Sequence, residues 1–310
     1  MSYSCCSAQS PGAIQAPSSE TVPERPDQAA TTGGPVAGGH SSQIDRAALV
    51  RKIKRLVVKV GTSSLTYGNG KINISQMDHL VRQMADVRNR GIEVVLVTSG
   101  AIAAGMGRIG LNKRPPDLAS KQALAAVGQG ILMQMYEKLF SEYGYMVGQV
   151  LLTREDISSE ERRINIKNTF DSLLNFGVIP IVNENDTVAV EEIRFGDNDT
   201  LSALVATLIN AELLILLSDI DGLYTEDPRI NPEATLIPVV TDISNSTPGI
   251  NGGTGSSLGV GGMRTKIEAA RIATARGVNV IIANSSVDSV ILEILDGKPL
   301  GTLFVGRFEA

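Results

Sequence analysis

The sequence predicts an α/β fold in which a mainly parallel sheet is covered by helices. From Leu56 onward, short β-branched runs alternate with longer helical patterns, which is typical of parallel strands joined by helices. The clearest helical segments carry a single apolar stripe, as packing against a sheet requires. No segment repeats with a fixed period, so a repeat architecture is not expected.

Six segments are predicted strands, because each is a short, largely apolar run with the length of a buried strand. In chain order they are Leu56–Val60, Glu93–Val97, Met146–Leu152, Val178–Val182, Leu213–Leu217 and Val278–Ala283.

Helices are expected between these strands. The spacing of apolar residues predicts a helix over Ile74–Arg90, with Ser75 as a candidate N-cap, and the same spacing recurs over Leu201–Leu208. The Gly/Ser-rich segment Ser244–Gly262 interrupts the alternation. Its composition suits a mobile flap near a site better than a linker between domains.

Composition sets the domain organisation. Residues 1–44 are rich in Ser, Pro, Gly, Ala and Thr, so they are predicted to form a disordered tail ahead of one domain, residues 45–310. Arg25 is the only Lys or Arg in that tail, which disfavours a transit peptide. Cys5 and Cys6 are the only cysteines, which excludes a disulfide framework or a cysteine zinc site and fits a reducing cytoplasm.

The charge and hydropathy patterns exclude two classes of partner. The formal net charge is −5, so the chain lacks the basic footprint of a protein that binds nucleic acid or an anionic membrane. No apolar stretch approaches the roughly 20 residues of a membrane span. We therefore expect a protein without a membrane segment, in which any phosphate binding is local.

Two polar clusters interrupt the apolar middle of the chain. Asn183–Asp186 follows a predicted strand, and Asp197–Asp199 precedes a predicted helix that begins near Thr200. In open α/β sheets ligands bind outside the carboxyl ends of the strands, so these clusters predict a ligand site. The alternative is turn and cap chemistry, with Asn198 or Asp199 capping that helix.

Two loops near the start of the domain have the chemistry of phosphate sites. Lys59 lies at the end of a predicted strand before Gly61 and two hydroxyl residues, although a strand-end lysine can also simply extend to water. Ser99 and Gly100 precede a predicted helix, whose free N–H groups favour an anion, although Ser99 can equally be an ordinary N-cap. The chain contains no G-x-x-x-x-G-K-[ST] sequence, which excludes a P-loop protein.

Two further glycine-containing segments differ in what they predict. Gly261–Lys266 combines a flexible entry, a predicted helix N-terminus and a lysine, which is a second candidate phosphate site, although a plain connector is the alternative. Gly105–Gly110 matches G-x-G-x-x-G, but it follows a helix start and not a strand, so a dinucleotide site is not expected. His40 and His79 belong to no catalytic constellation, which favours chemistry based on positioning and charge, such as phosphoryl transfer.

The order of these motifs resembles the glutamate 5-kinases, which are amino acid kinases. The resemblance covers roughly Lys52–Phe304 and rests on the following segments: Lys59–Ser63, Val97–Gly105, Lys121–Gln129, Asn183–Asp186, Gly196–Asp199, Asp221–Tyr224 and Gly261–Lys266. It implies a three-layer α/β/α fold, self-association as a dimer or tetramer, and phosphorylation of the glutamate side chain with ATP and Mg²⁺ in the first step of proline synthesis. It also implies feedback inhibition by proline. Many members carry a C-terminal PUA domain, which is not expected here because the sequence given stops soon after Phe304.

The resemblance also implies roles for individual residues. Lys59 and Lys266 would contact the transferring phosphate, and Asp199 would hold these two lysines together. Ser99, Gly100, Asp186 and Asn198 would bind glutamate. The nucleotide pocket would be lined by Ser218, Asp219, Val260, Gly261, Gly262, Met263, Arg264, Thr265 and Lys266, with Ser218 and Val260 standing where threonine is common.

No side chain is expected to be a dedicated metal ligand, since Mg²⁺ often remains on phosphates and water. Two alternatives stay open. One is another kinase of the same fold, acting on acetylglutamate or a nucleoside monophosphate, and the other is a non-catalytic sensor of glutamate or proline.

Overall fold

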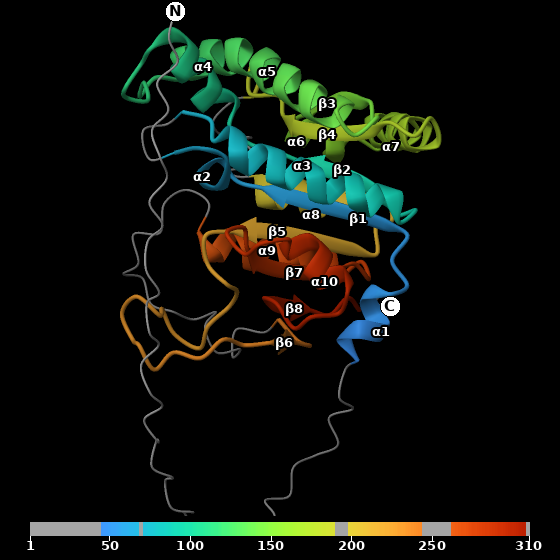
Figure 1. Ribbon diagram of the computed structural model, residues 1–310. Coiled ribbons are helices and arrows are strands. Elements are labelled where there is room, and N and C mark those ends of the chain that lie inside the picture. The colour runs from blue at the N-terminus through green and yellow to red at the C-terminus, as the bar shows by residue number, and fades with distance from the viewer. Residues whose placement is uncertain (1–44, 68–70, 190–197, 244–261, 308–310) are drawn as a thin grey trace, which may run out of the picture. The chain divides into compact units, whose positions relative to one another are not determined.

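The computed structural model describes residues 45–67, 71–189, 198–243 and 262–307, which contain one eight-stranded sheet. The predicted tail, residues 1–44, and nearly all of the predicted flap lie outside the described residues. Figure 1 shows the strands stacked from β3 and β4 at the top, through β1, to β8 and β6 at the bottom.

All six predicted strands are present, with ends that differ from the prediction by no more than two residues. The described strands are β1 (Arg55–Val60), β2 (Glu93–Val97), β3 (Val147–Leu152), β4 (Ile179–Glu184), β5 (Leu213–Ser218), β6 (Val239–Val240), β7 (Asn279–Asn284) and β8 (Thr302–Phe304). The prediction missed β6 and β8, because strands of two and three residues are too short to show a periodic pattern.

The strand order is β3-β4-β2-β1-β5-β7-β8-β6, and every neighbouring pair is parallel except β7 and β8. In this register Lys59 of β1 lies opposite Val97 of β2 and Leu216 of β5. The carboxyl ends of these three strands and of β4 therefore reach the same edge of the sheet, where ligands bind in open α/β folds.

Ten helices are described, one before the first strand and the others between strands. They are α1 (Arg46–Val50), α2 (Thr62–Leu65), α3 (Ile74–Asn89), α4 (Ala101–Ile109), α5 (Leu118–Ser141), α6 (Arg154–Ser158), α7 (Glu160–Asn175), α8 (Asn198–Leu208), α9 (Met263–Thr274) and α10 (Val290–Leu295). The expected cap of α3 was wrong. Asn73, and not Ser75, caps this helix, because Asn73 has extended backbone angles and its side-chain oxygen accepts from the Gln76 N–H at 3.1 Å.

The core forms on both faces of the sheet, which confirms the three-layer architecture. Along β1 the side chains alternate between the faces. Leu56 and Val58 join the cluster that contains the apolar side of α3, together with residues of α5 and α10. Val57 joins the opposite cluster, which contains residues of α7, α8 and α9. The sheet, including the carboxyl ends of its strands, thus lies between two layers of helices.

Gly105, the first glycine of the G-x-G-x-x-G match, allows two helices to pack closely, since a Cβ there would meet the Leu124 carbonyl oxygen at 2.1 Å. Gly105 and Gly107 lie inside α4, and Gly110 ends it in the left-handed conformation with φ 83°. Helix α5 packs against α4 so closely that a Cβ at Gly128 would meet the Ala101 carbonyl oxygen at 1.7 Å. The expectation that these glycines belong to a helix and its exit, and not to a strand-to-helix turn, agrees with this structure.

We expect Gly128→Ala to lower the free energy of unfolding by at least about 1–3 kcal/mol, because its methyl group would force the two helix backbones apart. The matched control is Gly130→Ala on the same helix, where a Cβ would meet nothing within 4 Å. That control should gain about 0.5–1 kcal/mol from helix propensity. Denaturant unfolding of both variants measures the difference, and equal stabilities would contradict the close approach.

Candidate active site

The predicted site residues that the structure describes come from the ends of four strands and from the first turns of two helices. Lys59 is in β1, Ser99 and Gly100 follow β2, Asp186 follows β4, and Ser218 ends β5. Asn198 and Asp199 open α8, while the segment from Gly262 to Lys266 opens α9. Val260 and Gly261 lie outside the described residues.

A buried carboxylate joins the two lysines. Asp199 is fully buried, and its Oδ1 forms an ion pair with the Lys59 ammonium. Its Oδ2 lies 3.1 Å from Lys266 Nζ and accepts from the Thr265 hydroxyl at 2.9 Å. Lys59 and Lys266 are 5% and 6% exposed, so neither extends freely to water. Two cations separated by 207 positions in the sequence therefore meet on one carboxylate, as the resemblance implied.

The charges around Asp199 decide its ionisation. Burial alone raises the pKa of this carboxyl, but the neighbouring Lys59 and Lys266 charges, with hydrogen bonds from Lys59 and Thr265, outweigh burial and hold its pKa below the ordinary value. The carboxylate is consequently charged at neutral pH and keeps the two ammonium groups close to each other. The cluster carries one net positive charge in a poorly hydrated place, where a phosphoryl group gains most from it.

Beside the lysines lies a chain of hydrogen-bonded amides. Asn198 Nδ2 lies 2.6 Å from the Thr98 carbonyl oxygen, 2.9 Å from Ser99 Oγ and 2.8 Å from Asn183 Oδ1, so its two N–H groups are shared among three acceptors. These contacts connect the first turn of α8 to the ends of β2 and β4. The alternative in which Asn198 or Asp199 merely caps a helix leaves these contacts with other elements unexplained. The described part of α8 also begins at Asn198, earlier than expected.

The start of α4 differs from the alternative reading of Ser99. Gly100 is the N-cap, in the left-handed conformation with φ 105°, and no side chain caps this helix. The Ser99 hydroxyl instead accepts from Asn198. The first-turn N–H groups of a helix have no partner within the helix itself, so an anion site at this start of α4 stays a prediction.

The start of α9 combines a helix N-terminus that lacks a side-chain cap among the described residues with a buried cation. Gly262 is the N-cap and makes no side-chain hydrogen bond, and Lys266 is the fourth residue of the helix. Met263 and Thr265 are half-buried, whereas Arg264 is exposed. A helix N-terminus and an ammonium group beside it both favour a phosphate.

The remaining predicted residues that the structure describes lie on the same edge of the sheet. Ser218 is buried at the end of β5, and its hydroxyl donates to Asp219 Oδ1 at 3.2 Å, while Asp219 is exposed. Asp186 is half-buried in the turn after β4. Asn183 belongs to a cluster that predicted a ligand site but had no individual role assigned. Thr98, Gln129 and Tyr136 were not predicted as individual site residues, although all four side chains belong to the polar network at this edge.

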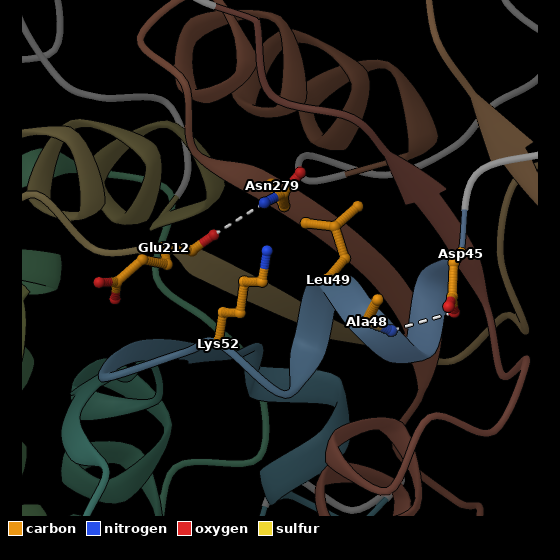
Figure 2. Close-up of a pocket in the computed structure, with 6 residues that line it drawn as sticks. All are labelled: Asp45, Ala48, Leu49, Lys52, Glu212 and Asn279. Atoms are coloured by element: carbon orange, nitrogen blue, oxygen red, sulfur yellow. Dashed lines mark hydrogen bonds between the residues drawn. The ribbon is translucent and has the colours of Figure 1, made fainter. Parts of the chain in front are cut away.

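A separate cavity lies at the opposite edge of the sheet. Its volume is about 340 Å³, and it is lined by Asp45, Ala48, Leu49, Lys52, Glu212 and Asn279. Figure 2 shows the Lys52 side chain extending between Leu49 and Glu212. Because Glu212 and Asn279 stand at the amino ends of β5 and β7, this cavity is remote from the lysine cluster.

The donor set at the carboxyl edge fits phosphate better than a bare metal ion. Among the described residues, no group of three or more His, Cys, Asp or Glu side chains is placed to hold a metal. Two buried ammonium groups and the N-terminus of α9 instead match the oxygens of a phosphate chain. Within the same residues, no helix is long and apolar enough to cross a membrane.

Comparison with known proteins identifies the family. The sequence model described as "Amino acid kinase family" matches residues 54–284, which is most of the chain. This chain belongs to the amino acid kinase family. Its lysine cluster and helix N-termini thus lie in an amino acid kinase domain.

Several curated relatives of this amino acid kinase share more than half of the aligned residues. The glutamate 5-kinase of Clostridium acetobutylicum is 55% identical over 262 residues, covering 84% of this chain and 98% of the relative. That of Clostridium tetani is 53% identical with the same two coverages. The glutamate 5-kinase of Carboxydothermus hydrogenoformans is 56% identical over 257 residues, which are 83% of this chain and 69% of the relative.

Solved structures support the fold. The UMP kinase from Bacillus anthracis superposes with a TM-score of 0.56 at 17% identity, over 82% of this chain and 97% of that one. The UMP kinase from Ureaplasma parvum gives the same TM-score at 15% identity, over 82% of this chain and 99% of that one. At these identities the likeness describes the architecture and not the substrate.

Proposed function

We propose that this chain is a glutamate 5-kinase. It transfers the terminal phosphoryl group of ATP to the side-chain carboxylate of L-glutamate, so that one carboxylate oxygen forms a bond to phosphorus and ADP leaves. The product is glutamyl 5-phosphate, and the reaction is the first step of proline biosynthesis. Relatives more than 50% identical over nearly the whole domain support this assignment, and the observation that carries the chemistry is the buried cluster of Lys59, Asp199 and Lys266.

This reaction needs charge stabilisation more than proton transfer. A glutamate side chain has a reference pKa of about 4.3, so it is ionised at neutral pH and needs no general base. Repulsion between the carboxylate and the phosphate chain opposes attack. In the proposed site, Lys59 and Lys266 bind the transferring phosphoryl oxygens, and Asp199 keeps both ammonium groups in position.

The binding roles divide along the edge of the sheet. We assign the acceptor site to Ser99, Gly100, Asp186 and Asn198, where the Asp186 carboxylate suits the free α-ammonium of glutamate that N-acetylglutamate lacks. We assign the nucleotide to Ser218, Asp219 and the start of α9. Mg²⁺ would be held mainly by phosphate oxygens and water, and when bound it neutralises part of their charge.

Three parts of the proposal concern the protein beyond its active site. A homo-oligomer, either a dimer or a tetramer, is expected for this chain, as are feedback inhibition by proline and a cytoplasmic location. Titrating proline into the assay described below, and measuring the molar mass in solution, address the first two.

The decisive experiment measures ADP release with three acceptors supplied separately: L-glutamate, N-acetylglutamate and UMP. Hydroxylamine traps the labile acyl phosphate and identifies the product. We expect turnover with glutamate and little with the other two. Turnover with N-acetylglutamate or UMP in its place would assign a different kinase activity, and binding of glutamate without any ADP release would indicate a sensor.

A further inference from the structure

Helix α5 brings two buried polar side chains to the candidate acceptor site. Gln129 and Tyr136 are seven residues apart, which is two helical turns, so they lie on the same face of α5. Their polar ends meet the ends of two strands. Gln129 Oε1 accepts from Asn183 Nδ2 of β4 at 2.9 Å, and the Tyr136 hydroxyl lies 2.7 Å from Thr98 Oγ1, just after β2.

Gln129 determines which way the Asn183 side-chain amide points. Asn183 Oδ1 accepts from Asn198 Nδ2 at 2.8 Å and from the Glu184 N–H at 3.0 Å, while its Nδ2 donates to Gln129. The two ends of an amide have nearly the same shape but opposite hydrogen-bonding character. Without the Gln129 oxygen, a rotated Asn183 would turn its NH₂ group toward the NH₂ group of Asn198 and break their hydrogen bond.

The orientation of Asn183 passes on to the acceptor site. Asn198 Nδ2 also contacts the Thr98 carbonyl and Ser99 Oγ, so its position depends on three acceptors at once. Gln129 therefore acts on Asn198 through Asn183, and on Ser99 through Asn183 and Asn198. Asn183 is 2% exposed and Gln129 is 8% exposed, which leaves little solvent to replace a lost partner.

The other end of the Gln129 amide makes no hydrogen bond with the described residues. This nitrogen, Gln129 Nε2, is buried. A buried donor without a partner destabilises the folded state. The hydrogen bond that Gln129 Oε1 accepts from Asn183 is therefore the polar contact that this side chain makes.

We infer that Gln129 is a positioning residue for the acceptor substrate. Its side-chain oxygen fixes the Asn183 amide, and Asn183 in turn holds Asn198 and Ser99 in the geometry that binds glutamate. This inference rests on the proposed function, because it concerns the acceptor site of that reaction. It predicts an effect on the acceptor and not on the nucleotide.

The test replaces Gln129 with methionine, which has similar length and no oxygen acceptor. We expect the KM for glutamate to rise about tenfold, as the misplacement of one hydrogen bond in a buried network would produce, and the KM for ATP to stay within about twofold. The substitution removes one unpaired buried donor, Gln129 Nε2, and creates another, Asn183 Nδ2. The melting temperature should therefore change little.

The matched control is Gln134→Met, the same substitution at an exposed position of the same helix. Its KM for glutamate should equal that of the unsubstituted chain. A double-mutant cycle then tests the route through Asn183: in an Asn183→Ala background, Gln129→Met should change the KM for glutamate by less than about twofold. If Gln129→Met does not fold, Gln129→Leu serves as the variant in both measurements.

The outcomes separate this inference from the proposed function. No glutamate-dependent turnover in the unsubstituted chain would overturn both. Normal turnover in the unsubstituted chain, with an unchanged KM for glutamate in Gln129→Met, would overturn the positioning role alone. The same holds for an equal rise in the two KM values, or for a full effect of Gln129→Met when Asn183 is already alanine.

Discussion

Replacing Lys266 with alanine is expected to lower kcat by about 10²- to 10³-fold, the usual effect of removing one preorganised group that stabilises transition-state charge. Lys266 is buried at the start of α9, next to Asp199, where its charge acts on a phosphoryl group with little screening by water. Steady-state kinetics with glutamate and ATP give the value. The fold should survive, because Asp199 keeps its ion pair with Lys59.

A second substitution, Lys266→Met, keeps the length of the side chain and removes only the charge, so it should reproduce the loss. The control is Arg271→Ala, which removes an exposed cation from the same helix and should leave kcat nearly unchanged. Far-UV circular dichroism and thermal unfolding confirm that each variant is folded. A folded Lys266→Ala protein with near-normal kcat would refute the proposed role of this lysine.

Asp199→Asn is expected to lower the free energy of unfolding by about 3–5 kcal/mol, because it removes one partner from a buried ionic cluster. The asparagine keeps the shape of the side chain, but Lys59 and Lys266 then face each other without the negative charge between them. Turnover should fall as well, since both ammonium groups lose their position. Denaturant unfolding at neutral pH measures the stability, and Asp86→Asn, in a surface pair with Arg90, is the control, which should stay within about 0.5 kcal/mol.

The same cluster predicts how the difference in unfolding free energy between the unsubstituted chain and Asp199→Asn depends on pH. Burial raises the pKa of the Asp199 carboxyl, but the two lysines outweigh burial and hold that pKa below its ordinary value. The folded state therefore protonates Asp199 less readily than the unfolded state does. Its contribution to stability is therefore complete above the unfolded pKa of about 3.9 and is lost as the pH falls through the lower pKa of the folded state. The stability gap between the unsubstituted chain and Asp199→Asn should be constant near neutral pH and shrink below about pH 4. A gap that already closes well above that pH would contradict the depressed pKa.

Much of the fold was visible in the sequence because most of its longer strands are buried over nearly their whole length. Such strands produce apolar, β-branched runs that are recognisable without tertiary information. The two-residue strand β6 and the three-residue strand β8 have no such run, because their pairing comes from the edge of an existing sheet. The cap of α3 was missed for a local reason, since Asn73 and Ser75 are both suitable cap residues and the backbone angles decide between them.

The candidate site likewise contains some residues that the sequence could indicate and others that it could not. Lys59 lies near the end of β1, and Ser99, Asn198, Asp199 and Lys266 lie in a loop or at helix starts, where a polar residue close to glycine is a local signal. Gln129 and Tyr136 have no such signal, because each is one polar residue within a long helix of mostly apolar residues. Only the packing of α5 against α4, through Gly128 and Gly105, brings these two side chains to the ends of the strands.

The sequence by itself determined the alternation of strands and helices, and through its ordered motifs it determined the family resemblance and the chemical groups available for phosphoryl transfer. Tertiary structure decided which of those groups meet: it joined Lys59 and Lys266 on a single carboxylate and linked Gln129 to Ser99 through two asparagines. Periodicity reports on burial within one element, whereas the pKa of Asp199 and the orientation of the Asn183 amide depend on partners from distant elements. Such partners are set by the register of the sheet and the packing of its helices, which no local pattern encodes.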